Sequence, residues 1–267
     1  MKKIIIGILF TGMLLFALVG CGGTESDENT VLTDEDFISN LGKGLEDRWD
    51  ISQKDTSMMS ISESQENISK CIDAEEDALL SMDRYTFEDK ALEELAQQYF
   101  DALDLQREGI QYAGTEQYTE YQQTFELGYY YRIVIINDLS ENFGLTVGSK
   151  YQSTLDDMLA EYSFALETVS TQEYVNELMT TLNYTKDEEK SDEYSTYYSA
   201  VIENTTDFTI DSLEINLSFL DSEGVTIYQT TDYINDFKAG DKYRSSLYVD
   251  VDTFDHIEYK VTAYSYG

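Results

Sequence analysis

The sequence predicts an α+β protein of two domains, a helical domain followed by a small antiparallel β-sandwich. Three observations predict this class. Apolar residues recur at helical spacing from residue 33 to about residue 186, and they alternate with polar residues beyond residue 194. Between these regions, the run "TKDEEKSDE" over 185–193 contains no apolar residue. We therefore expect a helical domain over 33–186, a β-sandwich over 194–267, and a boundary in the run between them.

The first twenty residues have the composition of an export signal. Lys2 and Lys3 precede an apolar run over residues 4–16, interrupted only by two glycines and a threonine. The sequence "CGGTE" ends the apolar stretch before it reaches the roughly 20 residues that a membrane span requires. The sequence therefore predicts a signal segment over residues 1–20 that is removed from the mature protein.

The end of this segment resembles the lipobox of bacterial lipoproteins, in which a cysteine thiol receives lipid and the chain is cut just before it. The matching residues are Leu18, Val19, Gly20 and Cys21. The resemblance implies that Cys21 becomes the lipidated N-terminus, carrying enough acyl chains for lasting attachment to the extracytoplasmic face of the cell membrane. A plain secreted protein, cut at an A-x-A-like site, is the alternative. We expect the polar segment 21–32 to be a flexible tether.

Composition excludes several classes of function. The chain has 53 acidic and 17 basic residues, a net charge of −36, and removal of the signal segment would make it two units more negative. Nucleic acids and anionic lipid heads require clustered Lys and Arg, which are absent from the sequence, so we expect neither partner. With Cys21 lipidated, Cys71 has no disulfide partner in the chain. The single histidine, His256, leaves no zinc set and no Ser-His-Asp triad. We expect no cofactor.

In the predicted helical domain, three serines have the spacing of a capping box with a Gln or Glu three residues later. The pairs are Ser62 with Gln65, Ser149 with Gln152, and Ser170 with Glu173. Apolar stripes at helical spacing predict the inner faces of an antiparallel bundle, although a tyrosine-rich ligand cavity is an alternative. The stripes are Ile68, Cys71, Ile72, Leu79 and Met82; Leu92, Leu95, Ala96, Tyr99 and Leu103; and Tyr151, Leu155, Met158, Leu159, Tyr162 and Leu166. We expect Cys71 to be a core residue, and the run "YYYRIVII" over 129–136 to be a buried helix or strand.

The region from residue 194 has the two-residue period of half-buried strands. In the clearest case, Leu213, Ile215, Leu217 and Phe219 alternate with polar residues. "LDSEGV" and "FKAGDK" then predict turns with Gly224 and Gly240 at positive φ, and strands are expected over 194–203, 225–230, 243–250 and about 257–263.

This region resembles the FxLYD domain of bacterial lipoproteins. The resemblance rests on "IENTTDFTIDSLEINLSFLDSEGVTIYQT", "FKAGDKYRSSLYVD" and "YKVTAY", and the segment 217–221 stands where the naming pattern would fall, with Asp221 matching it. The segment "NLGKGLEDRWD" over 40–50 is similar to the region that precedes this domain in some such lipoproteins. The resemblance implies an immunoglobulin-like sandwich on an exported lipoprotein and brings no catalytic residues.

Clusters of acidic residues are the other sequence features with side chains suited to metal binding or acid–base catalysis. Asp250, Asp252 and Asp255 are candidate calcium ligands, but their spacing does not match the EF-hand loop, and a solvated loop is the alternative. We expect "DAEED" over 73–77 and "KDEEK" over 186–190 to be solvated faces.

Three classes of function remain. We expect a non-enzymatic binding or scaffolding module that contacts a protein or polymer of the cell envelope, with Tyr228, Tyr248 and Tyr266 as outward-facing candidates in the sandwich. A solute-binding lipoprotein serving a transporter and an acid- or calcium-dependent envelope hydrolase are the alternatives.

Overall fold

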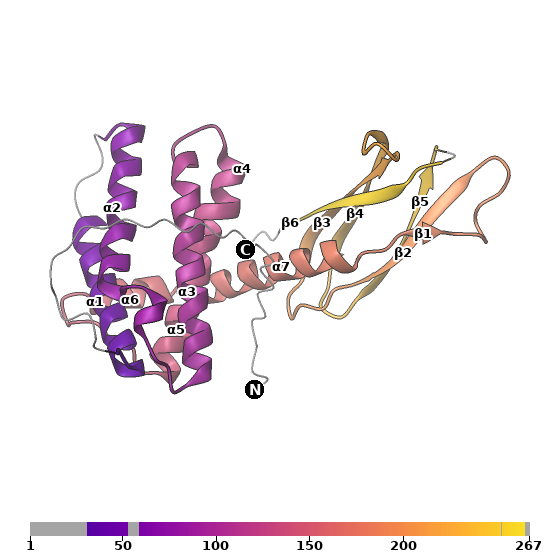
Figure 1. Cartoon of the computed structure of the whole chain (residues 1–267). Helices are drawn as coiled ribbons and strands as arrows, with labels where there is room; N and C mark the ends of the chain where they lie inside the picture. Colours follow the sequence, from indigo (N-terminus) through magenta and orange to yellow (C-terminus); the bar gives the residue numbers. More distant parts are fainter. Residues whose placement is uncertain (1–30, 53–58, 252, 265–267) are drawn as a thin grey trace. The chain divides into compact units, whose positions relative to one another are not determined.

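The computed structural model describes residues 31–52, 59–251 and 253–264. Helices form the first part of the chain and two small antiparallel sheets the last part (Figure 1), so the predicted mixture of helix and sheet is confirmed. Backbone contacts divide the chain into two compact units, with the division between Leu166 and Glu167. We call them the helical unit and the strand unit. The division lies inside a helix, whereas the sequence suggests a boundary over 185–193.

The helical unit is built from helices that pack in pairs, α1 against α2 and α3 against α5 (Figure 1). Its helices are α1 (Asp34–Ser52), α2 (Ile61–Leu79), α3 (Lys90–Gly109), α4 (Tyr118–Tyr121), α5 (Leu127–Asn142), α6 (Gln152–Leu159) and the start of α7 (Tyr162–Thr181). A π-helical turn, η3 (Gln122–Glu126), leads into α5, and single 3-10 turns cover Met82–Arg84 and Ile110–Tyr112. In the part of the chain that the structure describes, no helix has the length and apolarity needed to span a membrane.

Helix α5 is the most deeply buried helix of this unit. Every residue from Tyr131 to Ile136 is buried, including Arg132, so the predicted buried element "YYYRIVII" is confirmed as a helix. A helix that is apolar around its whole circumference has no face to offer water and must be surrounded by other elements. The predicted core role of Cys71 is also confirmed, because its side chain is buried in α2.

Two glycines allow the helices to approach closely where the polar site described below is formed. A Cβ atom on Gly44 of α1 would lie 3.0 Å from the carbonyl oxygen of Glu75 in α2. One on Gly128 of α5 would lie 2.6 Å from the carbonyl oxygen of Ala102 in α3. Real Cβ atoms essentially never come as close as 2.6 Å to a backbone atom, and a contact at 3.0 Å is tighter than most, so both positions favour glycine.

The three predicted capping boxes are wrong. Helix α2 begins two residues earlier than predicted, at a capping box in which Ser60 Oγ accepts from the Glu63 N–H and Glu63 Oε2 accepts from the Ser60 N–H. Helix α6 begins at Gln152 without a side-chain cap, and Ser170 lies inside α7. The four-residue capping pattern stabilises a helix only where the helix begins at that residue. The same pattern also occurs inside helices and in loops, so it does not locate a helix start by itself.

The strand unit consists of two three-stranded antiparallel sheets, ordered β1-β2-β5 and β4-β3-β6 (Figure 1). The strands are β1 (Thr185–Lys186), β2 (Thr196–Glu203), β3 (Ile210–Leu220), β4 (Thr226–Phe237), β5 (Lys242–Val249) and β6 (His256–Tyr264). The predicted alternation in β3 is confirmed, since Leu213, Ile215, Leu217 and Phe219 are all buried. Residues 185–186, which the sequence places in a solvated boundary, pair with β2.

The buried side chains of both sheets form one hydrophobic core, and the second half of α7 belongs to it. Tyr174, Val175 and Leu178 of α7, with Tyr184 just after it, pack in the same cluster as the inner residues of β2 and β3. Helical spacing therefore continues into the strand unit, which explains why the sequence-based boundary and the observed division differ.

The predicted turns are confirmed. Gly224 and Gly240 have φ of 78° and 76°, the left-handed conformation that glycine adopts without strain. In the first turn, Asp221 Oδ1 accepts from the N–H groups of Glu223 and Val225 at 2.9 and 3.0 Å. Asp221 thus has a structural role, because aspartate favours turns by bonding to nearby backbone.

Candidate functional site

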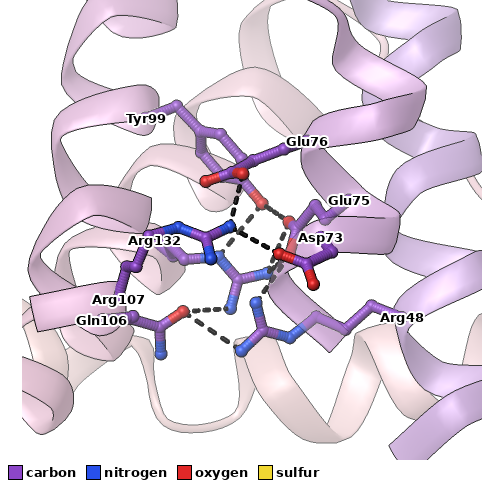
Figure 2. A network of polar contacts seen from close by, with 8 residues as sticks. All are labelled: Arg48, Asp73, Glu75, Glu76, Tyr99, Gln106, Arg107 and Arg132. Carbon is purple, nitrogen blue, oxygen red and sulfur yellow. Dashed lines mark hydrogen bonds and ion pairs between the residues drawn. The ribbon is translucent and has the colours of Figure 1, made fainter. Parts of the chain in front are cut away.

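A network of five polar side chains lies inside the helical unit (Figure 2). Its members come from four helices: Arg48 from α1, Glu75 from α2, Tyr99 and Gln106 from α3, and Arg132 from α5. Arg48 is 9% exposed and the other four are at most 2% exposed, so water has almost no access.

Glu75 is the centre of the network. Arg132 Nη2 donates to both of its carboxylate oxygens at 2.7 and 2.9 Å, Arg48 Nη1 donates to Oε2 at 2.7 Å, and the Tyr99 hydroxyl donates to Oε1. Burial alone would raise the pKa of Glu75, but the two guanidinium groups hold it below its ordinary value. The carboxylate is therefore ionised at neutral pH.

Gln106 joins the two arginines on their other side. Its Oε1 accepts from Arg48 Nη2 at 3.1 Å and from Arg132 Nη1 at 3.4 Å, while Arg132 Nε donates to the Tyr99 hydroxyl at 3.1 Å. Two cations and one anion are thus enclosed together. Buried charges are stable in a core when they are paired, and these hydrogen bonds pair them across four helices. Among the described residues, Gln106 Nε2 has no hydrogen-bond partner.

The sequence-based expectation for this region was wrong at one residue. "DAEED" was expected to be a solvated face, but Glu75 within it is completely buried. A usable signal existed, since Glu75 lies on the same helical stripe as Ile72 and Leu79, and Arg132 interrupts an apolar run. The neighbouring Asp73 and Glu76 do face outward, where both bind Arg107.

A cleft of about 780 Å³ lies beside α1 and is the strongest candidate for a ligand site. It is lined by Asp34, Glu35, Ile38, Ser39, Gly42, Lys43 and Glu46 of α1, Asp89 and Leu92 at the start of α3, and Phe143, Gly144, Thr146, Val147 and Gly148 between α5 and α6. We call it the α1 cleft. Its size is typical of sites for small organic ligands.

Backbone donors hold two carboxylates of the α1 cleft in place. Asp34 accepts from the N–H groups of Glu88 and Asp89, each at 3.0 Å, and Glu46 Oε1 accepts from the Gly148 N–H at 2.6 Å. Four acidic residues and one lysine line the cleft together with apolar side chains such as Ile38 and Phe143. The lining therefore combines a negative potential with an apolar surface.

The residues predicted for lipidation, Leu18 to Cys21, lie outside the described residues, as do Asp252 and Tyr266. Of the calcium candidates that are described, Asp255 Oδ2 lies 3.0 Å from Nδ1 of His256, and Asp250 is close enough to Tyr248 to raise the pKa of its hydroxyl. Among the described residues, no three His, Cys, Asp or Glu side chains form a group able to hold a metal ion.

The outward orientation expected for Tyr228 is wrong. Tyr228 is directly opposite Phe219 in the sheet, so it shares the inner face, and their ring centroids are 5.8 Å apart. Tyr248 is exposed as expected, and its ring contacts that of Tyr197 on the neighbouring strand. The pairing register decides which face of the sheet a residue lies on, because a shift of one position moves every side chain of the strand to the opposite face.

Comparison with known proteins found no match to the chain among family models, curated proteins or solved structures.

Proposed function

We propose that the chain is a lipid-anchored protein of the extracytoplasmic cell surface that binds a positively charged, partly apolar ligand in the α1 cleft and catalyses no reaction. The class of ligand is inferred from one observation, the lining of the cleft, which has four acidic residues, one lysine and an apolar surface. Clefts lined by charge of one sign concentrate ligands of the opposite sign. The strongly acidic composition of the chain adds to this effect.

The non-enzymatic part of the proposal is supported by how the cleft carboxylates are used. Both oxygens of Asp34 accept backbone N–H groups, and Glu46 accepts one, so these groups serve as structural acceptors. We assign the ligand to the helical unit rather than to residues 194–267. The finer architecture belongs to the same proposal: the helices form an antiparallel bundle, and the two sheets form an immunoglobulin-like sandwich of the FxLYD type. Two three-stranded sheets that share one core support it.

The cleft is tested by titrating a soluble form, residues 22–267, with three compounds that differ only in their head group: hexylamine, hexanol and hexanoate. We expect hexylamine to bind most tightly in isothermal titration calorimetry, because its ammonium group meets the carboxylates while its chain covers the apolar surface. The double variant Glu35→Gln, Glu46→Gln should bind it at least fivefold more weakly, and Lys43→Gln should bind it more tightly. Asp157→Asn in α6 makes the same type of charge change outside the lining and serves as the control. Equal binding of hexylamine and hexanoate would refute the assignment.

The anchor is tested separately by growing cells with a radioactive fatty acid. The parent protein should be labelled and recovered with membranes, because the residues before Cys21 resemble a lipobox. The Cys21→Ala variant should carry no label. Label that persists on this variant would show that the lipid is attached at another residue.

A further inference from the structure

The residues of α1 that line the α1 cleft form one stripe along most of the helix. They begin with Asp34 and its neighbour, recur in steps of four, and end at Glu46. Residues four positions apart lie on the same face of a helix, one turn after another. The lining therefore follows α1 for about three helical turns.

Carboxylates that can accept further hydrogen bonds lie at both ends of this stripe. Glu35 lines the cleft at the start of α1, and among the described residues its side chain has no hydrogen bond or ion pair. Glu46 lies eleven positions further along, where its Oε1 accepts from the Gly148 N–H at 2.6 Å and leaves Oε2 available. Eleven positions correspond to about three turns and about 16 Å along the helix axis, so both carboxylates lie on the same side of α1.

The other charged residues of the lining leave these two carboxylates without a counter-charge. Asp34 and Asp89 add negative charge at the Glu35 end, although both already accept backbone N–H groups. Lys43 is exposed, and within the described part of the chain it forms no ion pair with Glu46 or with any other carboxylate. A cation that enters the cleft at either end therefore meets an unpaired carboxylate.

The surface between the two ends is apolar. Ile38 lies between Glu35 and Glu46 on the stripe, and Leu92 and Phe143 line the same cleft from the start of α3 and from the residue after α5. A methylene chain that lies along this surface removes it from water, which is favourable. The lining therefore has the order negative, apolar, negative along α1.

We propose that the ligand of the α1 cleft is a linear diamine, a small molecule with an ammonium group at each end of a methylene chain. The chain is long enough to reach from Glu35 to Glu46, about 16 Å. This inference rests on the function proposed above and adds the number and the spacing of the charges. Linking two binding groups makes the second contact intramolecular, and it raises affinity only when the linker spans both sites. A cleft of about 780 Å³ has the size of a small-molecule site.

Diamines and amino alcohols of equal length provide matched probes, because they differ only in whether the second end is an ammonium or a hydroxyl group. The soluble form, residues 22–267, is titrated by isothermal calorimetry with 1,4-diaminobutane and 4-amino-1-butanol, and with 1,10-diaminodecane and 10-amino-1-decanol. We expect the short pair to bind within about twofold of each other, because four carbons do not reach the second carboxylate. 1,10-Diaminodecane should bind at least fivefold more tightly than 10-amino-1-decanol. A ratio that is the same for both lengths would overturn the proposal.

Single variants test the two ends separately. Glu35→Gln and Glu46→Gln should each lower the affinity for 1,10-diaminodecane at least fivefold, because one ammonium group then lacks its carboxylate. Each should weaken 10-amino-1-decanol by no more than about twofold, since its single ammonium group can use the other end. Asp47→Asn removes a carboxylate of α1 that lies outside the lining and is the control. Unchanged binding of 1,10-diaminodecane to either glutamine variant would refute a site with two ends. Thermal unfolding shows whether each variant remains folded.

The outcomes distinguish this inference from the function on which it rests. If hexylamine binds more tightly than hexanoate and the double variant Glu35→Gln, Glu46→Gln weakens it, the cleft binds cations as proposed. Should 1,10-diaminodecane then bind no more tightly than 10-amino-1-decanol, the cleft takes a single cation, and only the diamine inference is wrong. Equal binding of hexylamine and hexanoate would refute both.

Discussion

At Glu75 one carboxylate binds two guanidinium groups and a phenolic hydroxyl in a place that water does not reach. Removing one partner from such a group lowers the free energy of unfolding by more than the ion pair itself contributes to it, because the remaining charges stay buried without a counter-charge. The burial of Glu75 could be predicted from the sequence, because the residue lies on an apolar helical stripe. Its partners could not be predicted, because Arg48 and Arg132 come from other helices.

We predict that Glu75→Gln lowers the free energy of unfolding by about 3–5 kcal/mol, since it leaves Arg48 and Arg132 buried without an anion. The neighbouring Glu76→Gln makes the same chemical change at a partly exposed ion pair with Arg107 and should cost less than about 1 kcal/mol. Urea denaturation of both variants measures the difference. Similar losses in the two variants would show that the buried network has no special role in stability.

Glu173 in α7 predicts a dependence of stability on pH. Burial raises its pKa to about 7, so the folded protein retains a proton that the unfolded chain has already lost. Stability should therefore fall as pH rises from about 4.5, the ordinary pKa, to about 7. Because the side chain is partly solvated, we expect a change of only about 1–2 kcal/mol rather than the full value of the shift.

The Glu173→Gln variant should lose this part of the pH dependence and be more stable than the parent above pH 7. Glu177→Gln, at an exposed position of the same helix, is the control and should follow the parent. Thermal unfolding between pH 4.5 and 8 measures the effect. If the Glu173→Gln and parent curves run parallel, the carboxyl group does not titrate near neutral pH.

At the scale of elements, periodicity predicted which faces are buried better than where each element ends. The burial of the run within 129–136, the alternation in β3 and the glycine turns were predicted, because each depends on residues close together in the chain. The sequence left open whether that run is a helix or a strand, and the structure forms it as α5. The helix starts were not predicted, since Ser60 and Glu63 form the capping box that the sequence assigned to Ser62 and Gln65. Both pairs satisfy the local pattern, so the pattern by itself does not select one of them.

The close contact between α1 and α2 gives a prediction at this scale. Gly44→Ala would place a methyl group 3.0 Å from the carbonyl oxygen of Glu75 and 3.3 Å from its Cα and Cγ atoms. We expect a loss of about 1–3 kcal/mol, although alanine favours helices, because the two helices must move apart. The neighbouring exposed residue provides the control, and Lys43→Ala should change stability by less than about 0.5 kcal/mol. A stabilised Gly44→Ala protein in urea denaturation would contradict the close approach.

At the scale of the whole molecule, the extent of the strand unit is the most direct test. A fragment of residues 167–267 contains the second half of α7 and should unfold cooperatively on heating. A fragment of residues 185–267 keeps all six strands but lacks Tyr174, Val175, Leu178 and Tyr184, which are core residues. We expect it to show no cooperative transition, since deleting even one large core side chain costs about 2–5 kcal/mol. Equal transition temperatures, measured by circular dichroism, would show that α7 is not needed.

The sequence by itself determined the order of helical and strand regions, the inner faces of the clearest elements, the turns at Gly224 and Gly240, and the strongly acidic surface. These features depend on the period and the chemistry of neighbouring residues. Tertiary structure alone decided that α7 completes the core of the strand unit, that Arg132 meets Glu75 from 57 positions away in the chain, and that α1 borders a cleft. Periodicity shows which face of an element is buried, but what lies opposite that face depends on how the elements pack together.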